Sequence, residues 1–433
     1  MKFNKKTFYK IHQWVGIKLS ILFFIVCFSG TLATLSVEMD WLFIPEIRAE
    51  KESSKVDFNH KFQNLYDAYP QSESVYWFSQ TDSYVCDIVY ITENNHRYYA
   101  FVNPYTGEVQ GRVNLTFQRF FRDLHYFLFI PFQIGNFIVL TFGFLLFFSV
   151  ATALLFFNKW YKHLFPLKLK TKNKEVMYRS LHRLVGAWSV PFIFIISLTG
   201  IWYFMERTNL GHISDIANPK APILNNEKPF NYQDDKPFFL SIDFNKAIEV
   251  AKQTIPNLTI KDVKIPDSYN IPIYINGTSQ VPLLRNRANR VYINPVNYEV
   301  VKVQRADNLS AITFINDAMD PIHFGTWGGL TTKIFWFFGG LSISTLILSG
   351  IWVALRRNAK RKLFGKKDKT SIGKWVNVNY LIILTMIGFM YYVLKNRYSV
   401  EPRIFYVVSI AIIVFIFIGW YIFIYRINKS LHK

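Results

Sequence analysis

The chain has 433 residues, of which 51% are hydrophobic and 18% aromatic, and its formal net charge is +21. It contains six blocks of about 20 apolar residues, each long enough to cross a membrane as a helix, which excludes an ordinary soluble globular protein. Basic residues gather between these blocks, in segments 1–18, 158–183, 356–374 and 426–433. The charge therefore indicates anchoring at a membrane surface and excludes a nucleic-acid binder.

The six blocks predict an α-helical polytopic membrane protein with two long external stretches. Because positive residues favour the cytoplasmic side of a membrane, we expect a multi-pass protein with both termini in the cytoplasm. In chain order the predicted parts are membrane helix 1 (1–40), a first external domain (41–118), membrane helix 2 (119–158), a cytoplasmic basic loop (159–180), membrane helix 3 (181–206), a second external domain (207–322), membrane helix 4 (323–356), a second basic loop (357–375), membrane helices 5 and 6 (376–425) and a cytoplasmic tail (426–433).

The first apolar block also has features of a signal peptide, with Lys5, Lys6 and Lys10 preceding it. The block is long for a signal peptide, and removing it would delete part of an internal repeat. Of the two cysteines, Cys27 lies in the first membrane span and Cys86 in the first external domain, so they are not expected to pair. This disfavours a disulfide or a thiol metal site.

Each external stretch predicts one helix and a small antiparallel sheet. The first has a short helix over 62–69, ended by Pro70, and the second has an amphipathic helix over 243–254. Alternating and β-branched runs predict four strands in each stretch. These strands are expected near 75–79, 84–91, 98–102 and 109–113, and near 258–265, 271–275, 290–294 and 299–303.

An internal repeat organises the chain. The run IHQWVG, with its histidine at His12, aligns with the run LHRLVG, with its histidine at His182. Further on, NPYTGEV of the first half aligns with NPVNYEV of the second, and a histidine follows each, His125 and His323. Each half therefore has the order histidine, apolar helix, polar domain, histidine, apolar helix. Membrane helices 5 and 6 lie outside this parallel duplication.

Histidine near the hydrocarbon core of a membrane is costly and usually functional. We expect His12 and His182 at the inner ends of their helices, and His125 and His323 at the outer ends. Since a helix rises 1.5 Å per residue, most of the membrane thickness separates the inner histidines from the outer ones. Only the two inner histidines, or the two outer ones, can therefore share a metal centre. Two such pairs suit two haem b groups, whose irons take axial imidazoles, and two haems would carry electrons across the bilayer.

Aromatic, basic and glycine residues near the histidines fit this prediction. Arg122, Arg179 and Arg183 are candidates to hold haem propionates by charge-assisted hydrogen bonds. Gly16 and Gly186, one turn beyond their histidines, would let a flat ring approach the backbone. The aromatic side chains expected near the inner pair are Trp14, Phe24, Trp188, Phe192 and Phe194, and those near the outer pair are Phe127, Phe129, Phe324 and Trp327.

Other interpretations of these residues stay open. A single interfacial histidine is ordinarily a snorkelling or hydrogen-bonded side chain, and repeated glycines also serve helix–helix contact. Zinc or copper is a further choice of metal, although no carboxylate or cysteine stands at ligand spacing beside the four histidines. His163, at the inner surface, is a spare ligand for the inner site.

The histidine motifs, with Ser29-Gly30 and Thr199-Gly200, resemble the PepSY-associated transmembrane helix family of bacterial inner-membrane proteins, over about residues 5–356. The resemblance implies that the external domains are two small α+β PepSY-like domains in the periplasm. Members of this family include di-haem reductases of ferric siderophores. The resemblance therefore implies that His12, His125, His182 and His323 are the axial ligands of two b haems.

Together these features predict a di-haem transmembrane electron-transfer protein, and the resemblance implies that it reduces ferric siderophores or other ferric chelates for iron uptake. No catalytic side chain is assigned, because the redox chemistry would belong to the haem. External aromatics such as Tyr76, Trp77, Tyr84, Tyr98, Tyr99 and Tyr105 are candidates for a docking surface. The chain has no dinucleotide fingerprint or flavin domain, so membrane quinol or a cytoplasmic reductase would donate the electrons.

Two alternatives of other classes remain. One is a non-catalytic membrane regulator or anchor whose PepSY-like domains bind a peptide or a protease. The other is a transporter with inverted repeats, which is disfavoured because both repeats begin on the same side and no charged residue lies in the middle of a span.

Overall fold

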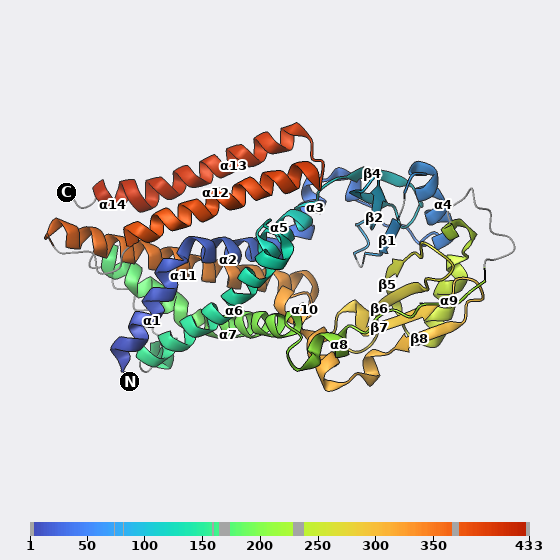
Figure 1. The fold of residues 1–433 in the computed structure, drawn as a ribbon, viewed down its shortest axis with the longest axis horizontal. Coiled ribbons are helices and arrows are strands. Elements are labelled where there is room, and N and C mark those ends of the chain that lie inside the picture. Colours follow the sequence, from blue (N-terminus) through green and yellow to red (C-terminus); the bar gives the residue numbers. More distant parts are fainter. Residues whose placement is uncertain are drawn as a thin grey trace.

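The computed structural model describes residues 4–72, 74–80, 82–157, 160–163, 174–227, 238–365 and 372–429. A helix bundle forms one end of the molecule and a β-sheet domain forms the other (Figure 1). Both termini lie at the end of the bundle far from the sheet, which we call the remote end; the opposite end is the sheet end. Most of the basic loop predicted over 159–180 falls outside the described residues.

Five helices in the described part of the chain are long and apolar enough to cross a membrane, and one bent pair of helices is a sixth candidate. This agrees with the six predicted spans and with a multi-pass membrane protein. The five are α6 (Phe132–Phe156), α7 (Lys174–Arg207), α11 (Gly329–Leu363), α12 (Ile372–Asn396) and α13 (Pro402–Trp420), the last continued by a π-helical turn (Tyr421–Tyr425) and α14 (Arg426–Lys429).

The first span is broken, whereas the sequence predicted one continuous helix. It consists of α1 (Lys5–Lys18) and α2 (Ser20–Thr34), bent by 74° at Leu19, followed by α3 (Ser36–Phe43). A break frees backbone carbonyl groups, which need other partners. Here the Asn379 side-chain nitrogen on α12 donates to the carbonyl oxygen of Lys18 at 3.0 Å. The break is therefore stabilised by a residue 361 positions away. The sequence near Leu19 contains no proline that would have predicted it.

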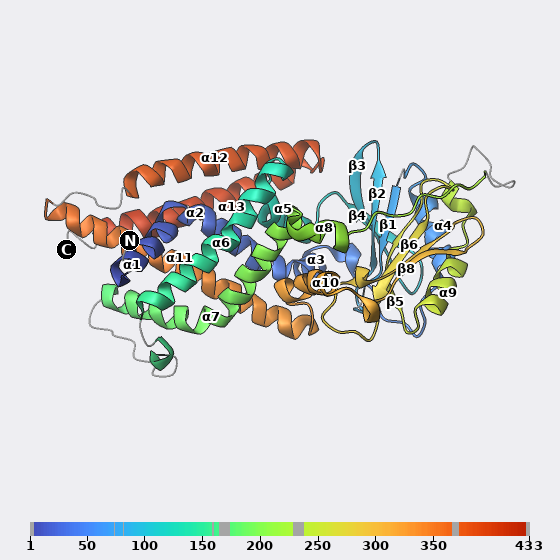
Figure 2. The same cartoon turned by 60° about the horizontal axis from the view of Figure 1, so that its bottom comes forward.

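The helices of the first four spans pack into one bundle. Helix α2 packs on α11, α6 on α7, α1 on α6, and α11 on α7, so the four spans close a ring. Their apolar core includes Phe23, Val139, Phe142, Val190 and Ile343. Helices α12 and α13 run along one side of this ring (Figures 1 and 2). No residue of α13 is buried, which is what a helix facing lipid requires.

The external elements form one antiparallel sheet of eight strands in the order β4-β3-β2-β1-β5-β6-β7-β8. The sequence predicted a separate small sheet in each external stretch. Both sets of four strands are present, but β1 pairs with β5 through Tyr76↔Lys264 and joins them edge to edge. The strands are β1 (Ser74–Phe78), β2 (Asp87–Glu93), β3 (His96–Val102), β4 (Val109–Val113), β5 (Thr259–Lys264), β6 (Ile273–Thr278), β7 (Asn289–Ile293) and β8 (Val300–Gln304).

Two helices cover the face of this sheet that lies away from the bundle, α4 (Phe58–Ala68) and α9 (Phe244–Thr254) (Figures 1 and 2). Their N-termini cap each other: the Asn245 side-chain oxygen accepts from the Phe58 amide, and the Asn59 side-chain oxygen accepts from the Phe244 amide. The two helices and both halves of the sheet share a single apolar core. The external region is therefore one folded unit.

Three shorter helices connect this unit to the sheet end of the bundle. They are α5 (Phe117–Phe127), α8 (Ile213–Ala217) and α10 (Ala311–Phe324). Helix α5 begins against the buried carboxylate of Asp40 on α3, which accepts from the amides of Phe117 at 2.5 Å and Gln118 at 3.2 Å. A carboxylate at a helix N-terminus satisfies free amides and favours the helix dipole.

Replacement of Asp40 by asparagine should flatten the pH dependence of stability. Burial raises the pKa of Asp40 to about 7, despite the two amide bonds. Because this value exceeds the ordinary one of about 3.9, the folded protein holds an extra proton between about pH 4 and 7, so stability falls as pH rises through that window. The unfolding temperature in detergent should fall from about pH 5 to 8 in the wild type, and less in Asp40→Asn.

The matched control is Asp67→Asn, since Asp67 is exposed on α4. It should reproduce the wild-type profile. Parallel profiles for wild type and Asp40→Asn would contradict the role of the buried carboxylate.

Candidate functional site

The structure brings the four histidines together as two pairs, at opposite ends of the bundle. The ring centroids of His12 and His182 are 6.5 Å apart at the remote end. Those of His125 and His323 are 6.3 Å apart at the sheet end. Thr199, which contacts His323, follows His182 on α7 by seventeen residues, about 25 Å of helix. These are the pairs that the sequence predicted.

Each histidine is held through Nδ1 by another helix of its own half. Because Nδ1 is engaged in every case, Nε2 is the nitrogen left for a further ligand. Among the described residues, no hydrogen bond reaches Nε2 of any of the four. The Nδ1 atoms lie 3.0 Å from the Ser149 carbonyl oxygen (His12), 2.9 Å from Ser349 Oγ (His182), 2.8 Å from the Val26 carbonyl oxygen (His125) and 2.7 Å from Thr199 Oγ1 (His323).

The partners of Nδ1 fix the tautomer of each ring. His12 and His125 face carbonyl oxygens, which only accept, so their Nδ1 atoms carry the proton. The hydroxyl of Ser349 donates to the Leu346 carbonyl oxygen at 3.0 Å, so it accepts from His182. The hydroxyl of Thr199 donates to the Ile195 carbonyl oxygen at 2.8 Å and accepts from His323. All four rings therefore present an unprotonated Nε2, the form that binds a metal.

The spacing of the rings suits two imidazoles on opposite sides of one metal ion. A metal–imidazole bond is about 2 Å long, and the ring centre lies roughly 1.2 Å behind the nitrogen, so two rings that bind one ion from opposite sides would be about 6.4 Å apart. The observed separations are 6.5 and 6.3 Å. In the described part of the chain no third His, Cys, Asp or Glu completes a metal-binding group. A four-coordinate zinc site is therefore not built at either pair.

Two of the aromatic residues expected near the inner pair point away from it. Trp14 is 50% exposed and Trp188 is 55% exposed. The helix explains this, because each residue turns about 100° around the axis. Trp14 is two positions from His12 and Trp188 is six from His182, so both fall on the opposite side of their helices. Near the outer pair, the exposed Phe324 still lies 5.7 Å from the ring of His323.

The remaining aromatic candidates pack mostly on their own neighbours. Phe192 and Phe194 pack against the apolar core of the bundle between the two levels. Phe24 stacks on Phe28 and on Phe415 of α13. The other candidates at the sheet end are the buried Phe127 and Phe129 and the half-exposed Trp327.

The three arginines proposed for haem propionates are all exposed. Arg179 forms an ion pair with Glu175 at 2.5 Å, one helical turn away. The Arg183 guanidinium lies 5.9 Å from the Phe157 ring, and Arg122 lies on α5, one turn before His125. Their role in binding a propionate stays a prediction. The side chain of His163, the proposed spare ligand, falls outside the described side chains.

Glycines stand where a side chain would change the sites. A methyl group at Gly16 would meet nothing within 4 Å, and one at Gly186 would meet only Leu346 at 3.7 Å. Protein packing therefore leaves the backbone open to a flat ring there. At Gly30 the opposite holds, because a methyl carbon would lie 2.7 Å from Cε1 of His125. Gly30 is required for His125 to lie close to α2.

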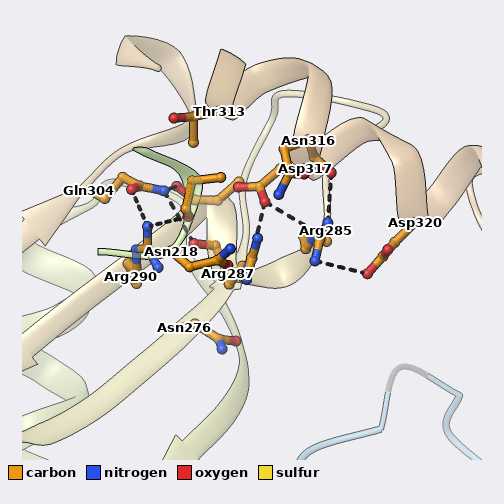
Figure 3. Close-up of polar contacts among 12 residues, drawn as sticks. Asn218, Asn276, Arg285, Arg287, Arg290, Gln304, Thr313, Asn316, Asp317 and Asp320 are labelled. Carbon is orange, nitrogen blue, oxygen red and sulfur yellow. Dashed lines mark hydrogen bonds and ion pairs between the residues drawn. The ribbon is translucent and has the colours of Figure 1, made fainter. Parts of the chain in front are cut away.

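Polar contacts connect α10, the helix that carries His323, to the sheet domain (Figure 3). The ring of Tyr203 lies 5.3 Å from that of His323, and its hydroxyl donates to Asp320 at 2.8 Å. Arg285, from the sheet domain, bridges Asp320 at 3.3 Å and Asp317 at 3.2 Å. Burial raises the pKa of Asp317, and the neighbouring guanidinium groups of Arg287 and Arg285 oppose that rise.

The sequence analysis missed this network and the Nδ1 partners. One available signal was a polar residue in an otherwise apolar run, as at Ser149 and Ser349, which stand at matching places in the helices after each polar domain. Nothing in the sequence pairs Tyr203 with Asp320, because the contact depends on how α7 meets α10.

These observations define a class: multi-pass membrane proteins with two paired-histidine sites in one helix bundle. The chain belongs to the family of the PepSY-associated TM region, whose model matches residues 9–357. The match includes all four histidines and ends before α12 and α13. No curated protein matches the chain.

Alanine substitution at Gly30 and at Gly350 should have opposite effects on stability, because a methyl group collides with a histidine ring only at Gly30. Gly30→Ala forces the His125 ring off its bond to Val26, and overpacking of this kind costs about 1–3 kcal/mol. Gly350→Ala meets His182 Cε1 at 3.5 Å, an ordinary contact, so it should gain up to about 1 kcal/mol of helix propensity. Unfolding in detergent measures both, and equal effects of the two variants would contradict the close approach at Gly30.

Proposed function

We propose that this protein carries electrons across a bacterial inner membrane through two b haems and reduces ferric siderophores or other ferric chelates in the periplasm. The observation that carries the proposal is the set of four imidazoles, paired at 6.5 and 6.3 Å, each with Nδ1 hydrogen-bonded to a neighbouring helix. A bound haem b would supply a one-electron Fe(III)/Fe(II) couple, with His12 and His182 holding one group and His125 and His323 the other.

The chain's own residues would hold each group and keep its surroundings dry. Ser149, Ser349, Val26 and Thr199 orient the four rings through Nδ1, which also raises the basicity of the ligating nitrogen. The apolar core between the two levels excludes water from the path. Arg122, Arg179 and Arg183 are the proposed propionate partners from the two ends of the bundle.

The proposed orientation follows from the charges at the remote end. Both termini and the described parts of the basic segments lie there, on the side that positive residues favour. The sheet domain is then periplasmic, and its two halves are the PepSY-like domains of the proposed duplication. Membrane quinol or a cytoplasmic reductase would donate one electron at a time to the inner site, and one ferric ion would accept it at the outer site.

The face of the sheet opposite α4 and α9 is the proposed docking surface. Tyr76, Phe78 and Tyr90 lie on this face. The ring centroid of Phe78 is 4.6 Å from that of Tyr76 and 4.4 Å from that of Tyr90. Of the external aromatics predicted to dock a chelate, Trp77, Tyr99 and Tyr105 are buried and cannot serve. Reduction lowers the affinity of the hard oxygen donors of a siderophore for iron, so the chelate would release Fe(II).

A second candidate function rests on the open edge of the sheet. Among the strands that the structure describes, β8 pairs only with β7, and its Val300, Val301 and Val303 are 39–42% exposed. An exposed edge can add a strand from an extended peptide. This supports the alternative of a membrane regulator that binds a peptide or a protease and holds no haem.

Absorption spectra of the purified protein, with a pyridine haemochrome count, test the proposal. We expect about two haems b per chain and loss of about one in each of His182→Ala and His323→Ala. His60→Ala, on helix α4, is the control and should keep both. A colourless wild type from cells supplied with haem and iron would contradict the proposal and favour peptide binding at β8.

A further inference from the structure

Each helix that carries an outer histidine is held by a triad of tyrosine, aspartate and arginine. On α10, Asp320 precedes His323 by three residues, accepts from the Tyr203 hydroxyl at 2.8 Å and pairs with Arg285 at 3.3 Å. On α5, Asp123 precedes His125 by two residues, accepts from the Tyr398 hydroxyl and pairs with Arg119 at 3.2 Å. The two triads have the same three side-chain types, and in each the aspartate lies within one turn of the histidine.

The two tyrosines come from different parts of the chain. Tyr203 belongs to α7, a helix of the second half, and aligning His12 with His182 places Ala33 at the matching position of the first half. The first half therefore has no tyrosine at the position that corresponds to Tyr203. Tyr398 lies between α12 and α13, beyond the part of the chain that the family model matches.

The Tyr398 triad is fully built and buried. Tyr398 and Asp123 are each 1% exposed, and Arg119 is 7% exposed. The Arg119 Nε donates to the Tyr398 oxygen at 2.8 Å while the Tyr398 hydroxyl donates to Asp123. Burial and the Asp123 carboxylate raise the pKa of Tyr398 to about 12, so the phenol remains a donor near neutral pH. Truncating any member would leave a buried polar group unpaired.

Other contacts fasten the same loop to α5 and to the sheet domain. Phe129, Met390, Leu394, Tyr398 and Val400 form one apolar cluster beyond the end of α5. The Asn114 side chain donates to the Ser399 carbonyl oxygen at 3.0 Å, and the Ser399 hydroxyl lies 2.9 Å from Nδ1 of His96 on β3. The loop therefore sits where α5 meets the edge of the sheet.

We propose that the C-terminal hairpin α12–α13 positions His125: its Tyr398 supplies the tyrosine that the first half of the repeat lacks at the position of Tyr203 and so fixes the outer histidine pair. The hairpin also contacts the first half near the other histidine pair. There the Asn379 side chain donates to the carbonyl oxygen of Lys18, at the break that follows the helix of His12. The consequence for a haem rests on the proposed function, whereas the positioning of α5 does not.

The test compares Tyr398→Phe with Tyr391→Phe in the full-length protein. Within the described part of the chain, the Tyr391 hydroxyl bonds only to Ser409 of the same hairpin, so its removal loosens the hairpin without removing a bond to α5. In Tyr398→Phe, amides of α5 should exchange with deuterium roughly tenfold faster, with α7 unchanged. Tyr391→Phe should leave α5 at the wild-type rate. Tyr203→Phe should produce the matching change on α10.

The second readout is the midpoint potential of each haem, with the outer haem identified as the one lost in His323→Ala. Tyr398→Phe should shift the outer haem and leave the inner one unchanged. Equal effects of Tyr398→Phe and Tyr391→Phe on α5 exchange, or an equal shift of both haems, would overturn the inference. If the wild type binds no haem, the proposed function fails, and α5 exchange still decides the role of Tyr398.

Discussion

The structure depends on placing four imidazole rings inside a membrane bundle with every Nδ1–H paired. An unpaired polar group in hydrocarbon costs several kcal/mol, so each ring needs an acceptor on a neighbouring helix. Two rings use backbone carbonyl oxygens and two use hydroxyls whose own protons are already given to the helix backbone. This arrangement engages every Nδ1 and leaves the Nε2 atoms of both ring pairs for a further ligand.

The rest of the fold keeps the two halves of the chain in register around these pairs. At the sheet end, pairing of β1 with β5 and the reciprocal caps at Asn59 and Asn245 join the external elements into one unit. In the second half, that unit is joined to α10, the helix of His323, through the ion pair of Arg285 with Asp320. In the first half, the hairpin does the same through Tyr398. The two halves thus reach a similar geometry by different routes.

Much of this architecture could be predicted from the sequence because it depends on local patterns. Apolar blocks predicted the spans, alternation predicted the strands of both external stretches, and helix rise with the repeat predicted which histidines meet. The break at Leu19 could not be predicted, since its partner Asn379 lies on α12. The joining of both sets of strands into one sheet could not be predicted either. The sequence of a strand in one external stretch does not show which strand of the other stretch will pair with its edge.

Side-chain direction set a second limit on prediction. Proximity in sequence suggested Trp14 and Trp188 as neighbours of the inner pair, yet helical rotation turns both outward. The residues that do hold the rings, such as Ser149 and Thr199, are small and polar and resemble ordinary residues of a membrane helix. Their role depends on which helices pack together, and that follows only from the assembled bundle.

The most direct test of the central claim is electron paramagnetic resonance of the oxidised, purified protein with spin counting. Two imidazole ligands give low-spin ferric haem, so the account predicts two low-spin signals that together amount to about two spins per chain. His182→Ala and His323→Ala should each remove a different one of the two. A single low-spin signal, a dominant high-spin signal or no haem signal would contradict the claim that both histidine pairs are haem sites.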